Sequence, residues 1–333
     1  MANVTSTNSP SQSFDSVPIV DIEGAERDPA RLRETADRIY EACTRVGFFY
    51  VAGHGVPSDL VSRTYELSQQ FFALPETRKK IVEINAINRG WIAEGQAKMT
   101  GAAKPDLKES YKISLDLPSD DPDMLAGLPL AGPNIWPDDL PGMAKTVYAY
   151  FEAVMEVGAK ILRATAVSLD LPEDFFAQRY TKPIARTGLL YYPDQEPDRG
   201  DDQFGVAAHT DYGCLTVLSQ DSSGGLQVMN KEEQWVEAPP IADTFVINVG
   251  DLLARWTNDR FTSTSHRVIN RSGHARYSIS HFYDPTYEAI VDPRDAGLPA
   301  GVESKYEPVL AGEYVLGRFD STMAYREKFK ATA

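Results

Sequence analysis

The first part of the chain carries helix-like and strand-like patterns of hydrophobic residues in turn. Apolar side chains recur at a helical spacing through residues 30–46 and again through 58–73. Short apolar runs at 17–21 and 48–51 are typical of strands instead. Polar residues dominate 1–16, for which we predict a disordered tail. Further along we expect a short helix ending near residue 82, a strand at 110–116 between loops, and an irregular connection over 119–142.

The second part of the chain begins with a long helix and then becomes rich in strands. We expect that helix over residues 141–169, and a short one starting near Asp174. Beyond residue 184, β-branched and aromatic runs are separated by turn residues at 187–192, 214–219, 225–229, 234–238, 244–248, 265–270 and 276–282. This spacing is typical of an antiparallel sandwich or barrel.

These patterns predict an α+β protein with a mainly β core. The N-terminal region, 17–142, supplies helices and edge strands. The region 143–333 supplies the long helix, a double-stranded β-helix (jelly roll) and a C-terminal cover in which 314–325 forms a helix or lid. We expect the two regions to form one catalytic unit.

Three residues have the chemistry and spacing of a metal site. Alternate residues of a strand project to the same side, so His209 and Asp211 can bind one metal from a single strand. His266 would join them from a second strand. Two imidazoles and one carboxylate can hold one face of a ferrous ion and leave the other face open, as in the facial triad of non-haem iron oxygenases.

A second pair of residues is suited to binding a carboxylate. Arg276 offers a planar guanidinium that a small carboxylate accepts bidentately, and the Ser278 hydroxyl points to the same side of the strand. A metal with open positions beside a carboxylate-binding pair indicates an enzyme.

Other polar residues favour structural roles. We interpret His54, between two glycines, as structural, and His274 as exposed in a hairpin turn. His281 points away from the Arg276 face, so we expect it in the core or in support of the metal ligands. We interpret Asp251 as a turn cap that can also steady the strands of the metal site.

Several ordered segments resemble the iron(II)/2-oxoglutarate-dependent dioxygenases. The resemblance runs from Val17 to about Tyr325 and is closest to the branch with isopenicillin N synthase, flavonoid and gibberellin oxidases, and thymine hydroxylase. The matching segments are Val17-Pro18-Ile19-Val20-Asp21, Gly47-Phe48-Phe49, His54-Gly55-Val56, Asn88-Arg89-Gly90-Trp91, Asp106-Leu107-Lys108-Glu109, Tyr191-Tyr192-Pro193, His209-Thr210-Asp211, Gly225-Leu226-Gln227-Val228, Asn248-Val249-Gly250-Asp251, Ser265-His266-Arg267-Val268 and Arg276-Tyr277-Ser278.

The resemblance implies a role for individual residues. His209, Asp211 and His266 would bind Fe(II), and Arg276 and Ser278 would bind the distal carboxylate of 2-oxoglutarate. Tyr192, of the pair Tyr191-Tyr192, would hydrogen-bond the cosubstrate. Plant members usually have Asn where this chain has Leu190, which removes one polar contact to the cosubstrate.

The resemblance also implies the reaction. Such an enzyme uses O2 and 2-oxoglutarate to oxidise a small molecule, by hydroxylation, desaturation or cyclisation, and releases succinate and CO2. Five side chains are candidates for the substrate pocket, each with an alternative in the core or, for arginine, in a surface ion pair. They are Arg89, Trp91, Tyr111, Phe204 and Phe282.

Two other functions stay open. One is an iron oxidase that needs no 2-oxoglutarate, in which Arg276 and Ser278 bind the carboxylate of the substrate itself. The other is a non-enzymatic sensor with a structural metal, which the open coordination face argues against, because structural sites usually have four protein ligands.

The composition of the chain limits the classes of binding partner and the cellular location that we expect. The 333 residues carry a net charge of −15 and a pI near 4.8, which argues against binding nucleic acid or anionic membranes. Cys43 and Cys214 are the only cysteines, and we expect both to be buried and reduced. With no signal-like or membrane-spanning run of apolar residues, the expected location is the cytoplasm.

Overall fold

The computed structural model describes residues 13–96, 104–194, 204–270 and 272–330. Most of the tail predicted for 1–16 therefore lies outside the described residues. Its last part is not a free tail: Phe14 is buried in an apolar cluster, and its carbonyl accepts a hydrogen bond from Asn230 Nδ2 at 3.2 Å.

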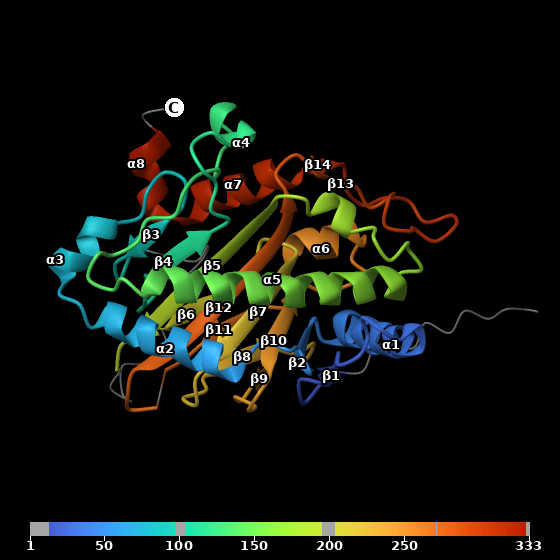
Figure 1. Ribbon diagram of the computed structural model, residues 1–333. Coiled ribbons are helices and arrows are strands. Elements are labelled where there is room, and N and C mark those ends of the chain that lie inside the picture. Colours follow the sequence, from blue (N-terminus) through green and yellow to red (C-terminus); the bar gives the residue numbers. More distant parts are fainter. Residues whose placement is uncertain (1–12, 97–103, 195–203, 271, 331–333) are drawn as a thin grey trace, which may run out of the picture.

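Two sheets form the centre of the described part of the chain (Figure 1). The larger has eight strands in the order β1-β2-β10-β7-β12-β5-β4-β3, antiparallel except for the β1–β2 pair. The smaller has the order β6-β11-β8-β9. The larger sheet comprises β1 (Ile19–Asp21), β2 (Phe48–Ala52), β3 (Gly90–Ile92), β4 (Glu109–Ser114), β5 (Pro183–Tyr192), β7 (Leu215–Gln220), β10 (Phe245–Val249) and β12 (Arg276–Thr286). The smaller comprises β6 (Val206–His209), β8 (Leu226–Met229), β9 (Trp235–Glu237) and β11 (His266–Val268).

Three helices cover the outer face of the larger sheet (Figure 1). They are α1 (Pro29–Arg45), α2 (Ser58–Phe72) and α5 (Met143–Ser168). Asp28 caps α1 by accepting a hydrogen bond from Ala30 N at 2.9 Å. The helix α5 packs closely on β12, because a Cβ on Gly158 would lie 2.6 Å from the Tyr283 ring. The predicted α+β class and the jelly roll packed by helices are confirmed.

The short elements were less well predicted. Among those without a prediction are β3, α6 (Asp251–Trp256), α8 (Glu327–Lys330) and the hairpin of β13 (Ile290–Val291) and β14 (Val309–Leu310). The connection expected over 119–142 contains the short helix α4 (Pro122–Leu125), and the single strand expected to carry both His209 and Asp211 is β6, which ends at His209. The predicted short helices appear as α3 (Glu76–Lys79) with η1 (Lys80–Val82), and as η2 (Ala177–Arg179). Elements of two to six residues contain too few side chains to show a period. The predicted C-terminal cover is α7 (Ala311–Thr322), followed by η3 (Ala324–Arg326).

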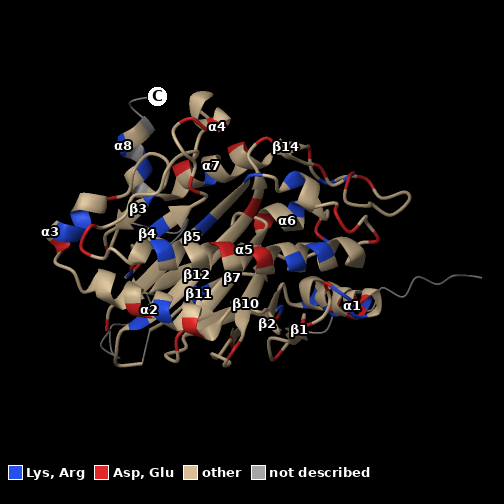
Figure 2. Ribbon diagram, in the orientation of Figure 1, with Lys and Arg blue, Asp and Glu red and all other residues tan. Residues whose placement is uncertain are grey.

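Charged residues lie mostly outside the sheets. Figure 2 shows acidic and basic residues interspersed over the helices. Of the described helices, none has the length and apolar character needed to cross a membrane.

Candidate metal centre and its cavity

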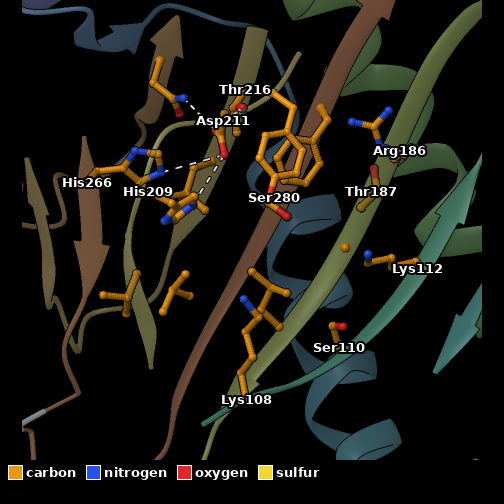
Figure 3. Close-up of a pocket in the computed structure, with 18 of the residues that line it drawn as sticks. Lys108, Ser110, Lys112, Arg186, Thr187, His209, Asp211, Thr216, His266 and Ser280 are labelled. Carbon is orange, nitrogen blue, oxygen red and sulfur yellow. Dashed lines mark hydrogen bonds and ion pairs between the residues drawn. The ribbon is translucent and has the colours of Figure 1, made fainter. Parts of the chain in front are cut away.

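The three predicted metal ligands meet between the two sheets. His209 is the last residue of β6, Asp211 lies just beyond it, and His266 begins β11 as the direct register partner of His209. Asp211 Oδ1 lies 3.6 Å from His209 Nε2 and 3.9 Å from His266 Nε2 (Figure 3). All three ligand atoms lie within 4.8 Å of one another, so a single ion can contact them together.

Backbone carbonyls orient both imidazoles. His209 Nδ1 lies 2.8 Å from the Ala207 carbonyl, and His266 Nδ1 lies 3.2 Å from the Thr264 carbonyl. A carbonyl can only accept, so each Nδ1 carries the proton and each Nε2 presents its lone pair to the centre.

The carboxylate of Asp211 is fixed from the opposite side. Its Oδ2 accepts hydrogen bonds from Thr216 Oγ1 at 2.6 Å and from Asn248 Nδ2 at 2.7 Å. These two donors occupy one oxygen and leave Oδ1 facing the histidines. Strand alternation shows only which side of its own strand each donor faces, and the sequence analysis assigned neither residue a role.

The electrostatics favour the ligand form of each group. Burial alone would raise the pKa of Asp211, but its interactions with His209, His266 and Thr216 hold that pKa well below the usual range. Burial, with the nearby His209, lowers the pKa of His266 to about 4. At neutral pH the site therefore offers a carboxylate anion and a neutral imidazole, the protonation states that bind a divalent metal.

Asp251 links the two segments that carry the ligands. Its backbone N–H donates to the Asp211 carbonyl at 2.7 Å. Its carboxylate accepts from Thr210 Oγ1 at 3.2 Å and from Ser263 Oγ at 2.7 Å. Asp251 begins α6 rather than capping a simple turn, and it joins the β6 end to the loop before His266.

The predicted carboxylate-binding pair lies on β12. Arg276 is fully buried; its Nε donates to the Gly224 carbonyl at 2.7 Å and its Nη1 lies 3.1 Å from Ser278 Oγ. Its guanidinium carbon lies 4.7 Å from the centre of the Tyr192 ring, and Tyr192 is its register partner on β5. None of the described carboxylates forms an ion pair with Arg276, so the buried cation is available to an anionic ligand.

A cavity extends from Tyr192 past the metal ligands to α7. Apolar side chains from both sheets form most of its wall, and Phe319 of α7 and Met323 close one side, as expected for the C-terminal cover. Three cations also line it, namely Lys108, Lys112 and Arg186 (Figure 3). Arg276 and Ser278 do not line it themselves, but they share a face of β12 with Ser280 and Phe282, which do.

Comparisons with known proteins agree with this geometry. Residues 17–139 match the family described as non-haem dioxygenase in morphine synthesis N-terminal, and residues 172–285 match the 2OG-Fe(II) oxygenase superfamily. The 2-oxoglutarate-Fe(II) type oxidoreductase hxnY of Emericella nidulans is 34% identical over 311 residues, covering 91% of this chain and 89% of the relative. The chain belongs to the Fe(II)/2-oxoglutarate-dependent oxygenases.

Other relatives of this oxygenase include a solved structure. Full-length Neurospora crassa T7H in complex with alpha-KG superposes with a TM-score of 0.81 at 33% identity, covering 91% of this chain and 95% of that chain. The 1-aminocyclopropane-1-carboxylate oxidase of Dictyostelium discoideum is 33% identical over 312 residues, covering 83% of this chain and 84% of the relative. The cofactors of this oxygenase are Fe(II) and 2-oxoglutarate, with O2 as cosubstrate.

Of the five predicted pocket residues in this oxygenase, Phe282 lines the cavity and four do not. Arg89 donates to the Ile87 and Leu130 carbonyls at 2.6 and 2.9 Å, so its guanidinium supports a loop. Trp91 Nε1 donates to Glu109 at 2.6 Å.

The other two predicted pocket residues that do not line the cavity face the core or a neighbouring arginine. Tyr111 is buried against Phe71, on the helix side of β4, because Ser110 and Lys112 face the cavity from the same strand. Phe204 packs in an apolar cluster and against the Arg267 guanidinium.

The remaining histidines of this oxygenase take the predicted roles. His54 Nδ1 accepts from Val56 N at 3.1 Å, and its ring stacks on Phe245. His281 is buried on the helix side of β12, and its Nδ1 shares a 2.8 Å hydrogen bond with Thr187 Oγ1. His274 is exposed.

Proposed function

We propose that His209, Asp211 and His266 bind the Fe(II) of this oxygenase, and that Arg276, Ser278 and Tyr192 bind its 2-oxoglutarate. We further propose that the reaction is hydroxylation of a small molecule held in the cavity, with release of succinate and CO2. The observation that carries this proposal is the meeting of three ligand atoms within 4.8 Å, beside a buried arginine with no anionic partner among the described residues.

Different side chains would bind the metal, orient the cosubstrate and line the substrate cavity. When bound, the iron and 2-oxoglutarate supply the oxidising chemistry with O2. Asp211 and the two histidines hold the ion on one face, and Arg276 orients the cosubstrate through its distal carboxylate. Phe282, Phe319 and Met323 exclude water from the open face, which protects the oxidant from side reactions.

Turnover with controlled cosubstrates tests this proposal. Fe(II)-loaded protein is incubated aerobically with 2-oxoglutarate and a library of small molecules, and succinate is measured. We expect succinate release that requires both Fe(II) and 2-oxoglutarate and rises with the true substrate. Iron binding without oxidative turnover would instead favour a sensor with a structural metal.

A second candidate is an oxidase that needs no 2-oxoglutarate. It is considered because the Dictyostelium relative is named as an oxidase of 1-aminocyclopropane-1-carboxylate, a compound with a carboxylate that such a pair could bind. In that case Arg276 and Ser278 would bind the carboxylate of the substrate, and product would form in the absence of 2-oxoglutarate.

We also propose that the enzyme works in a reducing compartment such as the cytoplasm. Cys43 and Cys214 are both buried and unpaired, which supports this location. Fractionation of cells that produce the protein would test it.

A further inference from the structure

Lys112 is the one cavity cation without a carboxylate partner among the residues that the structure describes. Lys108 Nζ pairs with Asp106 at 2.9 Å, and Arg186 Nη2 pairs with Asp284 at 2.9 Å. Lys112 reaches the cavity from β4 (Figure 3), where its Nζ lies 5.9 Å from the centre of the Tyr325 ring. An ammonium in such a place is costly unless something pairs with it.

A second polar group without a hydrogen-bond partner among the described residues lies on a neighbouring strand. It belongs to the same row of the sheet, that is, the row of residues that are register partners across adjacent strands. Lys112 pairs with Gly188 in the β4–β5 register, and Gly188 pairs with Ser280 in the β5–β12 register. Ser280 is 5% exposed, and its Oγ makes no hydrogen bond with any residue that the structure describes. Because Gly188 has no side chain, nothing on β5 fills the row between the ammonium and the hydroxyl.

The charges of the site leave Lys112 in excess. With the metal site filled, Fe(II), Asp211, Arg276 and the dianion of 2-oxoglutarate sum to zero. The Lys108–Asp106 and Arg186–Asp284 pairs are each neutral. One positive charge, on Lys112, remains for a group that neither protein nor cosubstrate supplies.

The side chains around Lys112 and Ser280 indicate which kind of ligand would fit beside them. Phe282 lies next to Ser280 on the same face of β12, and Ile92, Phe319 and Met323 also line the cavity. A ligand that filled this space would have an apolar body attached to its anionic group. The metal ligands open into the same cavity, so the body could be held near the iron.

We propose that Lys112 and Ser280 form an oxyanion subsite, and that the substrate is a carboxylic acid with an apolar body. The ammonium pairs with the carboxylate, and the hydroxyl donates a hydrogen bond to one of its oxygens. This assignment rests on the proposed function, because it places the cosubstrate at Arg276 and the substrate beside the metal.

Binding of matched acids and amides tests the subsite. Anaerobic Fe(II)- and 2-oxoglutarate-loaded protein is titrated by calorimetry with 3-phenylpropanoate, octanoate and their primary amides. We expect each acid to bind at least about tenfold more tightly than its amide, because the amide lacks the charge that Lys112 pairs with. In Lys112→Met the preference should fall below about twofold, and in Ser280→Ala it should fall partway.

The controls separate the subsite from the cosubstrate site. Lys145→Met, at an exposed position, should keep the wild-type preference. The affinity for 2-oxoglutarate should be unchanged in Lys112→Met. The proposal is overturned if the acids bind no better than their amides or do not bind, or if Lys112→Met keeps the preference or weakens 2-oxoglutarate instead. Failure of the proposed function would show separately, as wild-type protein that binds no 2-oxoglutarate in the presence of Fe(II).

Discussion

Asn248 donates a 2.7 Å hydrogen bond to the Asp211 oxygen that faces away from the two histidines. Asn248 comes from β10 of the larger sheet, while the histidines lie on β6 and β11 of the smaller one. The metal ligands are thus oriented by a bond that crosses between the sheets. Thr216, on β7, makes a second such bond to the same oxygen.

Removal of these two donors should weaken the metal site without deleting a ligand. In Asn248→Ala and in Thr216→Val, Asp211 would lose part of its orientation, and we expect Fe(II) affinity to fall about 10- to 100-fold. Equilibrium dialysis of Fe(II) under anaerobic conditions measures this. Ser219→Ala, a change at another buried β7 hydroxyl, should bind Fe(II) like wild type. Wild-type affinity in both donor variants would show that the carboxylate needs no such support.

Loss of the guanidinium should weaken cosubstrate binding. In Arg276→Ala a buried carboxylate of 2-oxoglutarate would lose its charged partner, so the concentration needed for half-maximal succinate release should rise by about tenfold or more. Arg276→Lys should recover only part of it, because an ammonium lacks the planar fork. An unchanged 2-oxoglutarate requirement would instead support the oxidase that binds its substrate through this residue.

The charge of Lys112 should reduce the stability of the free protein. Burial, with the charges of Arg186 and Lys108, lowers the pKa of Lys112 from 10.5 to about 7. At a pH between these two pKa values, the unfolded chain binds more protons than the folded one. The destabilising effect of Lys112 is therefore fully present below about pH 7 and is lost as the pH rises toward 10.5.

Lys112→Met should therefore be more stable than wild type at pH 6. One pKa unit corresponds to about 1.4 kcal/mol, and with the side chain partly solvated we expect a gain of about 1–3 kcal/mol that shrinks toward pH 10. Urea unfolding at both pH values measures it. The neighbouring cations keep their partners, since Lys108 pairs with Asp106 and Arg186 with Asp284. A lower stability for Lys112→Met at pH 6 would mean that the lysine has a stabilising contact.

Sequence reasoning predicted the fold and the candidate metal site from separate signals. Strand-like runs separated by turns predicted the jelly roll, and the spacing of His209, Asp211 and His266 was sufficient to identify the three residues that meet. The pocket residues were harder, because alternation tells that Tyr111 and Lys112 face opposite sides but not which side holds the cavity. Aromatic character suggested Tyr111, whereas the structure places Lys112 in the cavity and Tyr111 under the helices.

The contributions of Thr216, Asn248 and Ser280 depend on contacts between strands that are far apart in the chain. Thr216 and Asn248 become partners of Asp211 only when β7 and β10 pair and the smaller sheet faces them. Likewise, Ser280 and Lys112 share a row only through Gly188. A single sequence shows strands but not their register, so these relationships required the structure.

The most direct test of the metal and cosubstrate sites is an anaerobic titration of Fe(II)-loaded protein with 2-oxoglutarate, followed by visible absorption. We predict a weak metal-to-ligand charge-transfer band that saturates in wild type, needs a higher 2-oxoglutarate concentration in Arg276→Ala, and is absent in Asp211→Ala and His209→Ala. A wild-type band that persists unchanged in Asp211→Ala, or iron-loaded wild type that shows no band, would contradict the assignment of these residues.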